Sequence, residues 1–402
     1  MRIVVLAGGA DQIALIQELK RRGHETILVD YYPNPPARAF ADRHIVASTL
    51  DVNRVKGITK EYNADMICTA CTDQALLTVA QVSEELDLPC YISYETALSV
   101  TNKSFMKKKM SDNGIPTSKY KILDKIDLSQ LKGLSYPLVV KPVDCNSSKG
   151  VVKVDSDLSL ECALNEAFDL SRTKTAIVEE FNDGEEISAD FYIEGNVAKF
   201  LCATKTKKVQ NSQSFTITQS YYPALIRKQE ITLTKIAQRI VEVFGISNSP
   251  LLVQLIVKDD IMNVLEFSAR MGGGSKYKLI EVLSGVNIME KYVDLILGHL
   301  PSVSPERRVN YAVCSYIYCN KGKIKDVLGF DNLVAEGTIQ HYFFYKTWGM
   351  YISNAKTSGD RVAGYIITAE SKNELEEKLL IADSSLSVID DDNEDIMIHG
   401  WI

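Results

Sequence analysis

The 402-residue sequence has no long apolar run: none reaches the roughly 18–20 residues that a transmembrane helix needs. It also has no excess of positive charge, because 45 Lys and Arg stand against 52 Asp and Glu, for a formal net charge of −7. Proteins that bind nucleic acid usually carry a clear basic surplus. We therefore expect no membrane partner and no nucleic-acid partner, although net charge averages away any local basic patch. Histidine is scarce, with five residues and none beside a recognisable nucleophile motif.

The cysteines do not form a disulfide framework. The eight residues are scattered, usually inside apolar segments, which indicates reduced thiols and a cytoplasmic protein. Cys68 and Cys71 form a single CxxC with no second pair at zinc spacing. We interpret it as structural, with redox or metal chemistry as the less favoured alternative. The N-terminal MRIVVLAGGADQ has too short an apolar part for a signal peptide, so a first β-strand is expected.

Composition and length indicate a globular protein of several domains. Hydrophobic residues make up 46% and charged residues 24%, proportions that are ordinary for folded proteins. At roughly 150 residues per domain, the length suggests about three domains. No internal repeat or low-complexity segment is present in the sequence.

Short apolar strands alternate with helical patterns through the first hundred residues. Strands are expected at residues 2–6, 25–29, 44–47, 66–69 and 90–92, and helices at 11–22, 52–62 and 74–86. Such alternation predicts a parallel, doubly wound sheet, which we assign to residues 1–101. The prolines at 33, 35 and 36 exclude regular structure after the second strand.

The pattern changes after residue 101. A Lys-rich helix at 102–113 begins an α+β segment that continues to about residue 300. Within it, residues 205–220 are polar and lack periodicity, so a loop is expected there. The remaining residues, 301–402, indicate mostly short strands with one helix at 372–382.

A glycine pair, Gly8-Gly9, follows the first strand, and Asp30 ends the second. This partly matches a dinucleotide-binding fingerprint, but its third glycine is missing. A tight strand-to-helix turn is the preferred interpretation, and NAD binding is the alternative. The run 72–74 (Thr-Asp-Gln) follows the fourth strand, where it either lines a ligand crevice or caps the next helix.

Lys141 ends an apolar strand, where an unpaired ammonium group would be costly to bury. The segment 146–151 that follows (NSSKGV) is small, polar and rich in donors. Point charges and a donor-rich loop are what a polyphosphate needs. The alternative is an ordinary hairpin loop.

Two further segments place polar side chains at the end of an apolar strand or within one. The acidic linker 179–186 (EEFNDGEE) offers a carboxylate for ribose and backbone for a purine edge, or is simply a solvated turn.

Gln254 and Glu266 interrupt two apolar strands, and a carboxylate inside a strand must be paired or metal-bound. Mg²⁺ prefers such oxygen ligands together with phosphates. Arg270 is suited to clamp a phosphate or carboxylate, and a Glu266–Arg270 salt bridge is the alternative.

Four of these features, in this order, resemble the ATP-grasp superfamily of carboxylate–amine (or thiol) ligases. They are the glycine pair, Lys141 with its polar loop, the acidic linker, and the two strands that carry Gln254 and Glu266. The resemblance covers nearly the whole chain and is strongest to the branch of biotin carboxylase, phosphoribosylglycinamide synthetase and L-amino acid ligase. It implies a mixed α/β and α+β fold in three parts. These are a Rossmann-like pre-ATP-grasp domain (1–101), an ATP-grasp domain of two subdomains with a hinge near 180–184 (102–300), and a C-terminal β-rich domain (301–402).

The resemblance also implies roles for individual residues. Lys103 and Lys141 would contact the phosphates of ATP, under a flexible lid formed by Ser147, Ser148, Lys149, Gly150 and Val151. The adenine site would be formed by Glu179, Glu180, Phe181 and Asn182, and Glu186 would bind ribose. Glu266 would be the principal ligand of Mg²⁺ (or Mn²⁺), with Gln254 and Ser268 as further metal residues. Arg270, Lys141 and Lys149 would act in catalysis, with Arg270 stabilising an acyl phosphate.

The implied activity is ATP-dependent ligation of a small carboxylate, favoured to be an amino acid, to an amine through an acyl phosphate, with release of ADP and phosphate. Its partners would be these small molecules, and a homodimer is compatible with the resemblance. Three alternatives stay open. They are a phosphoribosylglycinamide synthetase-like ligase, a non-catalytic ATP-binding protein (supported by Ser268, where the family usually has Asn) and an NAD-dependent oxidoreductase.

Overall fold

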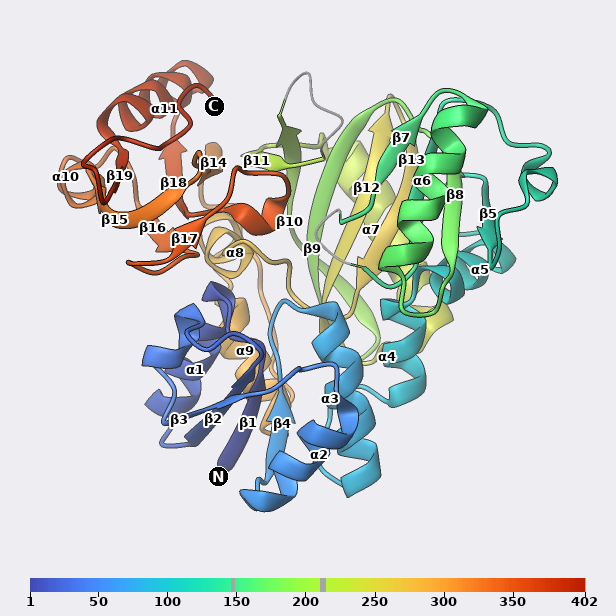
Figure 1. Cartoon of the computed structure of the whole chain (residues 1–402), viewed down its shortest axis with the longest axis horizontal. Helices are drawn as coiled ribbons and strands as arrows, with labels where there is room; N and C mark the ends of the chain where they lie inside the picture. The colour runs from blue at the N-terminus through green and yellow to red at the C-terminus, as the bar shows by residue number, and fades with distance from the viewer. Residues whose placement is uncertain (146–148, 210–214, 402) are drawn as a thin grey trace.

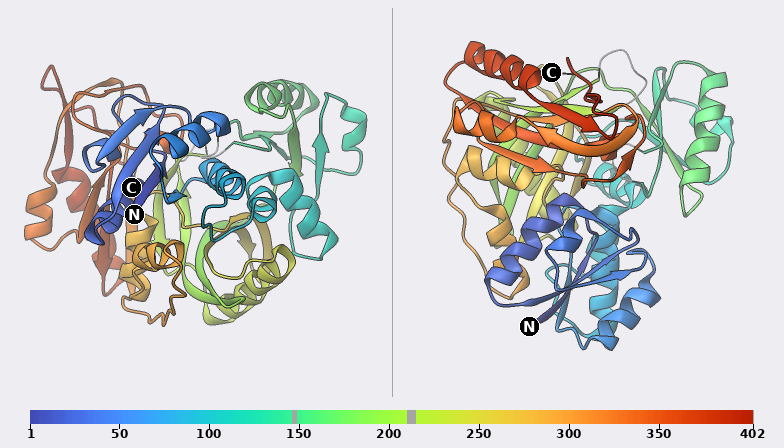
Figure 2. Two further views of the ribbon diagram at one scale, coloured as in Figure 1. Left: turned by 90° about the horizontal axis from the view of Figure 1, so that it is seen from below. Right: turned by 60° about the vertical axis from the view of Figure 1, so that its left-hand side comes forward.

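The computed structural model describes residues 1–145, 149–209 and 215–401 (Figure 1). Within these ranges no helix combines the length and the apolar character needed to cross a bilayer. The fold contains a parallel sheet at the N-terminus, a small antiparallel sheet and a large antiparallel sheet that continues into the C-terminal region. The small sheet and the C-terminal strands lie at opposite ends of the molecule (Figure 2).

The N-terminal sheet has four parallel strands in the order β3-β2-β1-β4. They are β1 (Arg2–Leu6), β2 (Glu25–Asp30), β3 (Arg43–Val46) and β4 (Met66–Cys68). Alternate side chains of β1 point to opposite faces, so Ile3 and Val5 pack toward α1 (Ala10–Arg21), and Val4 and Leu6 toward α2 (Val52–Glu61) and α3 (Asp73–Leu86). Helices on both faces confirm the predicted doubly wound parallel sheet.

The strand predicted at residues 90–92 is wrong. Asp87 ends α3 in the left-handed conformation, and the chain then runs as a loop to α4 (Tyr94–Thr101). Ser93 caps α4 by accepting a hydrogen bond from the Thr96 amide. Ile92 instead packs with Ala97 in an apolar cluster. The proline-rich segment also differs from expectation, since a short 3-10 helix (Pro36–Ala39) begins there with proline in its first turn, where no amide donor is needed.

The small sheet has the order β5-β8-β6-β7 and is antiparallel. Its strands are β5 (Tyr120–Leu123), β6 (Leu138–Pro142), β7 (Val152–Val154) and β8 (Ala176–Glu180). Leu138 and Val140 pack against α6 (Asp157–Leu170). Because side chains alternate along β6, the same pleat turns Lys141 to the other face. Helix α5 (Lys103–Asp112), capped by the Asn102 side chain, precedes this sheet.

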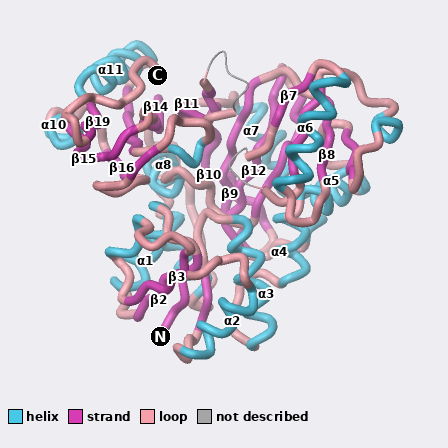
Figure 3. The backbone as a smooth tube through the Cα atoms, viewed as in Figure 1, coloured by secondary structure: helices cyan, strands magenta, loops and turns pink. Residues whose placement is uncertain are grey.

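The large sheet has eight strands in the order β13-β12-β9-β10-β11-β14-β18-β16. Figure 3 draws its strands in magenta, with β9, β10, β11, β12, β14 and β16 labelled. Its strands are β9 (Glu185–Glu194), β10 (Val197–Lys208), β11 (Ile217–Tyr222), β12 (Ser249–Lys258), β13 (Ile261–Ser268), β14 (Tyr311–Ile317), β16 (His341–Phe344) and β18 (Ala363–Ala369). The helices associated with it are α7 (Arg227–Phe244), α8 (Lys276–Ser284) and α9 (Ile288–Ile296). Strand β11 pairs with β14, so the sheet passes from residues before 300 to residues after 300 without interruption.

The loop predicted at residues 205–220 is wrong at both ends. Strand β10 continues to Lys208, and β11 begins at Ile217 and pairs with it. The segment has no apolar alternation because polar side chains are buried on both faces of it: Thr206 and Gln219 are buried and lie at adjacent positions of the β10–β11 register. Residues 210–214 lie outside the described residues.

The C-terminal region is mostly strands, as expected. A separate three-stranded sheet, β17-β15-β19, is formed by β15 (Gly322–Leu328), β17 (Tyr351–Ile352) and β19 (Ser387–Asp390). The predicted helix is α11 (Lys372–Ser385), and a short additional helix, α10 (Phe330–Ala335), was not anticipated.

Candidate active site

Two adjoining cavities lie between the sheets. The hinge cavity, of about 490 Å³, lies at the linker between β8 and β9 and is bounded by the small and large sheets. The glycine cavity, of about 460 Å³, is lined by the glycine runs 8–9 and 272–274. Both are lined by Thr206, Ile217, Gln254 and Glu266, so these residues stand where the two cavities meet.

Most of the residues predicted for the nucleotide and metal sites line the hinge cavity. They are Lys103, Lys141, Val151, Glu179, Glu180, Phe181, Asn182, Glu186, Gln254 and Glu266. Arg270 lines the glycine cavity instead. Lys149 is exposed, and neither it nor Gly150 is among the residues that line either cavity. Ser147 and Ser148 lie outside the described residues.

The linker after β8 is held by its own backbone. The Glu180 amide donates to the Lys119 carbonyl at 2.9 Å, and the Phe181 amide donates to the Pro137 carbonyl at 2.9 Å. The Asn182 side chain donates to the Ser118 hydroxyl. Gly184 has a φ of +155°, and a Cβ there would lie 2.7 Å from the Val257 carbonyl oxygen, so the linker can approach β12 this closely only with glycine.

A buried carboxylate, Glu179, lies between two lysines at the wall of the hinge cavity. Glu179 Oε1 is 2.9 Å from Lys141 Nζ and 3.2 Å from Lys107 Nζ. Burial alone would raise the pKa of Glu179, but the two ammonium groups lower it below its usual range. Burial lowers the pKa of Lys107 to about 8, although Glu179 partly opposes that shift. Sequence reasoning missed Lys107; its spacing of four residues from Lys103 on one helix was the available signal.

Glu266 is paired with Lys103, whose Nζ lies 3.0 Å from Oε2. Burial would raise the pKa of Glu266, but Lys103 and Lys141 lower it to about 2, so the group is ionised at neutral pH. Gln254 is the direct cross-strand partner of Glu266 in the β12–β13 pair, which puts both side chains on one face of the sheet. One carboxylate and one amide oxygen fit a hard cation that also takes phosphate oxygens. Among the described residues no group of three or more His, Cys, Asp or Glu side chains is placed to hold a metal ion.

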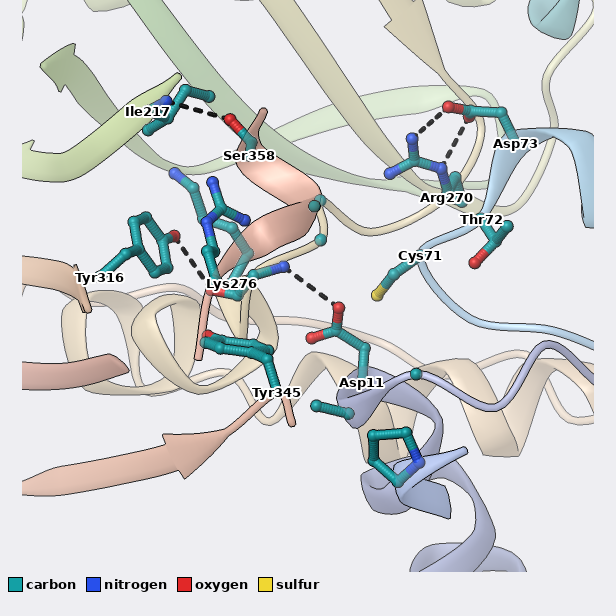
Figure 4. Close-up of a pocket in the computed structure, with 18 of the residues that line it drawn as sticks. Asp11, Cys71, Thr72, Asp73, Ile217, Arg270, Lys276, Tyr316, Tyr345 and Ser358 are labelled. Atoms are coloured by element: carbon teal, nitrogen blue, oxygen red, sulfur yellow. Dashed lines mark hydrogen bonds and ion pairs between the residues drawn. The ribbon is translucent and has the colours of Figure 1, made fainter. Parts of the chain in front are cut away.

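Asp73 organises the other side of the junction (Figure 4). Its carboxylate receives two donors from Arg270, with Nε at 2.7 Å from Oδ1, and also accepts the Ser268 hydroxyl. The Glu266–Arg270 salt bridge considered as an alternative is therefore not formed, because each residue has another partner. Neither Thr72 nor Asp73 caps α3 through its side chain, and both line the glycine cavity.

The Asp30 carboxylate accepts hydrogen bonds from the backbone of two nearby turns. It accepts the Gly8 amide at 2.6 Å and the Tyr32 amide at 2.8 Å. A Cβ at Gly8 would lie only 2.5 Å from Pro35 Cβ, so the proline covers this glycine. These contacts favour the tight-turn interpretation of Gly8-Gly9 over a dinucleotide site.

Several residues of the glycine cavity were not singled out from the sequence. Asp11 accepts the amides of Gly274 and Ser275 at 3.1 and 2.8 Å. The Tyr316 hydroxyl donates to the Gly274 carbonyl at 3.0 Å (Figure 4). Other members of this group are Lys276, Tyr345 and Arg361. No sequence signal linked them, because Asp11 lies in the first helix of the chain while the others are spread between residues 276 and 361.

A profile of the ATP-grasp domain family matches residues 134–278, which run from just before β6 into α8. The chain contains an ATP-grasp domain. The matched ATP-grasp segment holds Lys141, Glu179, Gln254, Glu266 and Arg270, and so includes both sides of the junction between the cavities.

Similar proteins extend this finding. A formate-dependent phosphoribosylglycinamide formyltransferase from Maridesulfovibrio salexigens is 28% identical over 186 residues, covering 45% of this chain and 47% of that protein. The chain thus matches about half the length of this curated relative. The solved L-amino acid ligase from Bacillus licheniformis superposes with a TM-score of 0.79 at 22% identity, covering 97% of this chain and 98% of that one. Phosphoribosylglycinamide synthetase from Anaerococcus prevotii gives a TM-score of 0.76 at 20% identity, covering 97% and 99%. These likenesses establish a shared fold.

Proposed function

We propose that this protein is an ATP-dependent ligase that joins a small carboxylate to an amine, with release of ADP and phosphate. One observation carries the proposal: two cavities meet at Gln254 and Glu266, with lysines on one side and an arginine on the other. A nucleotide in the hinge cavity would present its terminal phosphate at this junction. A carboxylate in the glycine cavity would meet it there.

ATP is assigned to the hinge cavity. Lys103 and Lys141 line it and supply positive charge toward the phosphates. The amides of Glu180 and Phe181 are already used, so the linker would meet the adenine edge through its carbonyl groups and Asn182. Glu186, which is ion-paired with Lys208 and lines the same cavity, is placed to accept from ribose hydroxyls.

Glu266 and Gln254 would hold Mg²⁺ or Mn²⁺ between the cavities. The cation, when bound, offsets phosphate charge so that two anions can approach. Ser268 was predicted as a further metal residue; its hydroxyl donates to Asp73, so it supports that carboxylate in the present arrangement. Lys149 stays a predicted catalytic residue without a described place at the cavities.

Arg270 and Asp73 would form the binding site for the substrate carboxylate. Arg270 faces the junction and has the planar donor geometry that binds a carboxylate or an acyl phosphate in two-point contact. Asp73 orients that guanidinium through two hydrogen bonds. The acyl phosphate forms when the carboxylate oxygen takes the terminal phosphoryl group of ATP. The amine nitrogen then bonds to the acyl carbon, the bond from that carbon to the phosphate oxygen breaks, and inorganic phosphate leaves together with a proton lost by the nitrogen.

An amino acid is the favoured substrate within this proposal, supported by the fold likeness to the L-amino acid ligase. The names of the phosphoribosylglycinamide formyltransferase and synthetase support a second candidate, a ligase for a phosphoribosylated amine. In either case we assign the nucleotide to residues 102–300, and the other substrates to the space between residues 1–101 and 301–402.

The test is a coupled ADP-release screen with amino acids in pairs, with and without Mg²⁺, and product masses read directly. We expect ADP only when Mg²⁺ and a carboxylate–amine pair are both present. Glu266→Gln should abolish turnover, whereas Glu242→Gln, which alters an exposed residue on α7, should not. Unchanged turnover in Glu266→Gln would refute the metal assignment, and no ADP from any pair would refute the ligase.

A further inference from the structure

The charged groups of the glycine cavity are sorted into two poles. The acidic pole, Asp11 and Asp30, comes from the N-terminal sheet and the helix that follows β1. The basic pole, Lys346 and Arg361, comes from the C-terminal region. None of these four residues forms an ion pair with another described residue. Burial raises the pKa of Asp11 and lowers the pKa of Lys346, so a ligand group of opposite charge would stabilise the ionised form of each.

The other ionic groups of this cavity are already paired. Arg270 is bound to Asp73, and Lys276 Nζ lies 3.6 Å from Asp190 Oδ2 and donates to Thr204. They contribute little net charge to a ligand in the centre of the cavity.

The two poles meet at Gly274. Asp11 accepts the Gly274 amide, while a Cβ on Gly274 would lie 2.6 Å from Arg361 Nη1. Asp11 and Arg361 therefore flank the same residue without contacting each other within ion-pair distance. The Arg361 guanidinium lies over the Tyr316 ring, 3.8 Å from its centre, and its Nε donates to the Tyr318 hydroxyl at 3.2 Å. These tyrosines fix its orientation without neutralising it.

Three of the glycine-turn amides that a phosphate would need are already taken by carboxylates. Asp30 accepts the Gly8 amide, and Asp11 accepts those of Gly274 and Ser275. Free amides at a glycine turn are the usual basis of phosphate binding. A phosphate dianion would meet a carboxylate at each of these glycine turns, which costs affinity through desolvation and like-charge repulsion.

We propose that the glycine cavity binds the amine substrate as a zwitterionic amino acid, with its ammonium group at Asp11 and its carboxylate at Arg361, and that it rejects phosphate esters. This inference rests on the proposed ligase function and favours the amino-acid candidate over the phosphoribosylated one. Asp11 and Arg361 are then the residues that determine specificity for the amine substrate.

The test is direct calorimetric binding of small probes to the full chain in the presence of MgADP, where no turnover occurs. The probes are the common amino acids, their amides, their hydroxy-acid analogues, ethanolamine and O-phosphoethanolamine. We expect one or more amino acids to bind about 10- to 100-fold more tightly than the matching amide or hydroxy acid, as charge-assisted hydrogen bonds require. O-phosphoethanolamine should bind no more tightly than ethanolamine.

Variants then assign the two ends of the ligand. Arg361→Gln should remove the preference for acid over amide, and Asp11→Asn the preference for amine over hydroxyl, while Arg239→Gln and Asp112→Asn on exposed helix surfaces leave both preferences intact. The inference is overturned if no amino acid binds, if the phosphate ester binds more tightly, or if the variants keep both preferences. The wild-type probes decide the matter if a variant fails to fold.

The two proposals fail in different ways. Amino-acid binding with these preferences but no ADP release would refute the ligase and leave the binding assignment standing. ADP release driven by a phosphorylated amine would support the ligase and overturn the zwitterion site.

Discussion

Replacing Glu179 with glutamine removes the only carboxylate that contacts the Lys107 and Lys141 ammonium groups in the described chain. Lys107 and Glu179 have side-chain exposures of 1% and 2%, and Lys141 of 9%, so water offers little compensation. Breaking a buried ion pair by removing one partner costs about 3–5 kcal/mol. Native domains are stable by only about 5–15 kcal/mol, so the small sheet should open far more often.

Hydrogen exchange followed by mass spectrometry is the suitable assay, because both tryptophans, Trp348 and Trp401, lie in the C-terminal region. Protection of amides in β6 and β8 should fall by roughly 100- to 4000-fold in Glu179→Gln. Protection in the N-terminal sheet should change little. Glu242→Gln is the matched control on an exposed ion pair.

The defect should also depend on pH. Burial already lowers the pKa of Lys107 to about 8, and Glu179 opposes that shift, so the variant's Lys107 should have a still lower pKa. At pH values in the window between that lower pKa and about 8, Lys107 is neutral in the folded variant. At the same pH it is charged in the unfolded chain and mostly charged in the folded wild type. The variant therefore gains stability relative to wild type as pH rises through this window. A deficit below about 1 kcal/mol, or one that grows from pH 6 to pH 8, would refute the reasoning.

Three further predictions concern the cavities. Gly274→Ala places a methyl carbon 2.6 Å from Arg361 Nη1 at a residue with a φ of +75°. In urea unfolding it should destabilise the chain more than Gly245→Ala, a control at a residue with a φ of +66° and open space around it. Equal losses of stability in the two variants would contradict the clash. Asp73→Asn should slow ADP release by roughly tenfold or more, because Arg270 loses the carboxylate that orients it. An unchanged rate would contradict the orienting role of Asp73. The pKa of Glu266 is about 2, below its ordinary 4.5, so the stability that its charge contributes is complete above pH 4.5 and is lost as pH falls toward 2. The difference in melting temperature between wild type and Glu266→Gln should therefore be constant from pH 8 to 5 and shrink below that; a drift above pH 5 would contradict the pKa.

Local patterns predicted the elements that carry the site. Lys141 stands out in the sequence because it ends an apolar strand, and Glu266 because it interrupts one; both line the hinge cavity. Alternation of strands and helices was enough for the parallel N-terminal sheet. The strand predicted at 90–92 was wrong because an apolar pattern of only three residues fits a strand and a loop with one buried side chain equally well.

Long-range partners could not be predicted in this way. Asp73 and Arg270 are separated by 197 residues, and no local pattern indicates that they pair. Arg361 follows a polar turn that resembles any surface turn, and only the fold brings it against Gly274. The polar strands around residues 205–220 were missed because their buried side chains are polar: Thr206 lines both cavities, and Gln219 donates to the Ser315 hydroxyl of the next strand.

The pairing of β11 with β14 determines how the chain can be divided. A cut near residue 300 would leave β11 with unpaired backbone groups along one side, a surface that promotes aggregation. The same cut would remove Tyr316 and Arg361 from the wall of the glycine cavity. Truncated fragments and domain exchanges at that position are therefore poor starting points for engineering, and substitution within the C-terminal strands is the workable route to altered substrate preference.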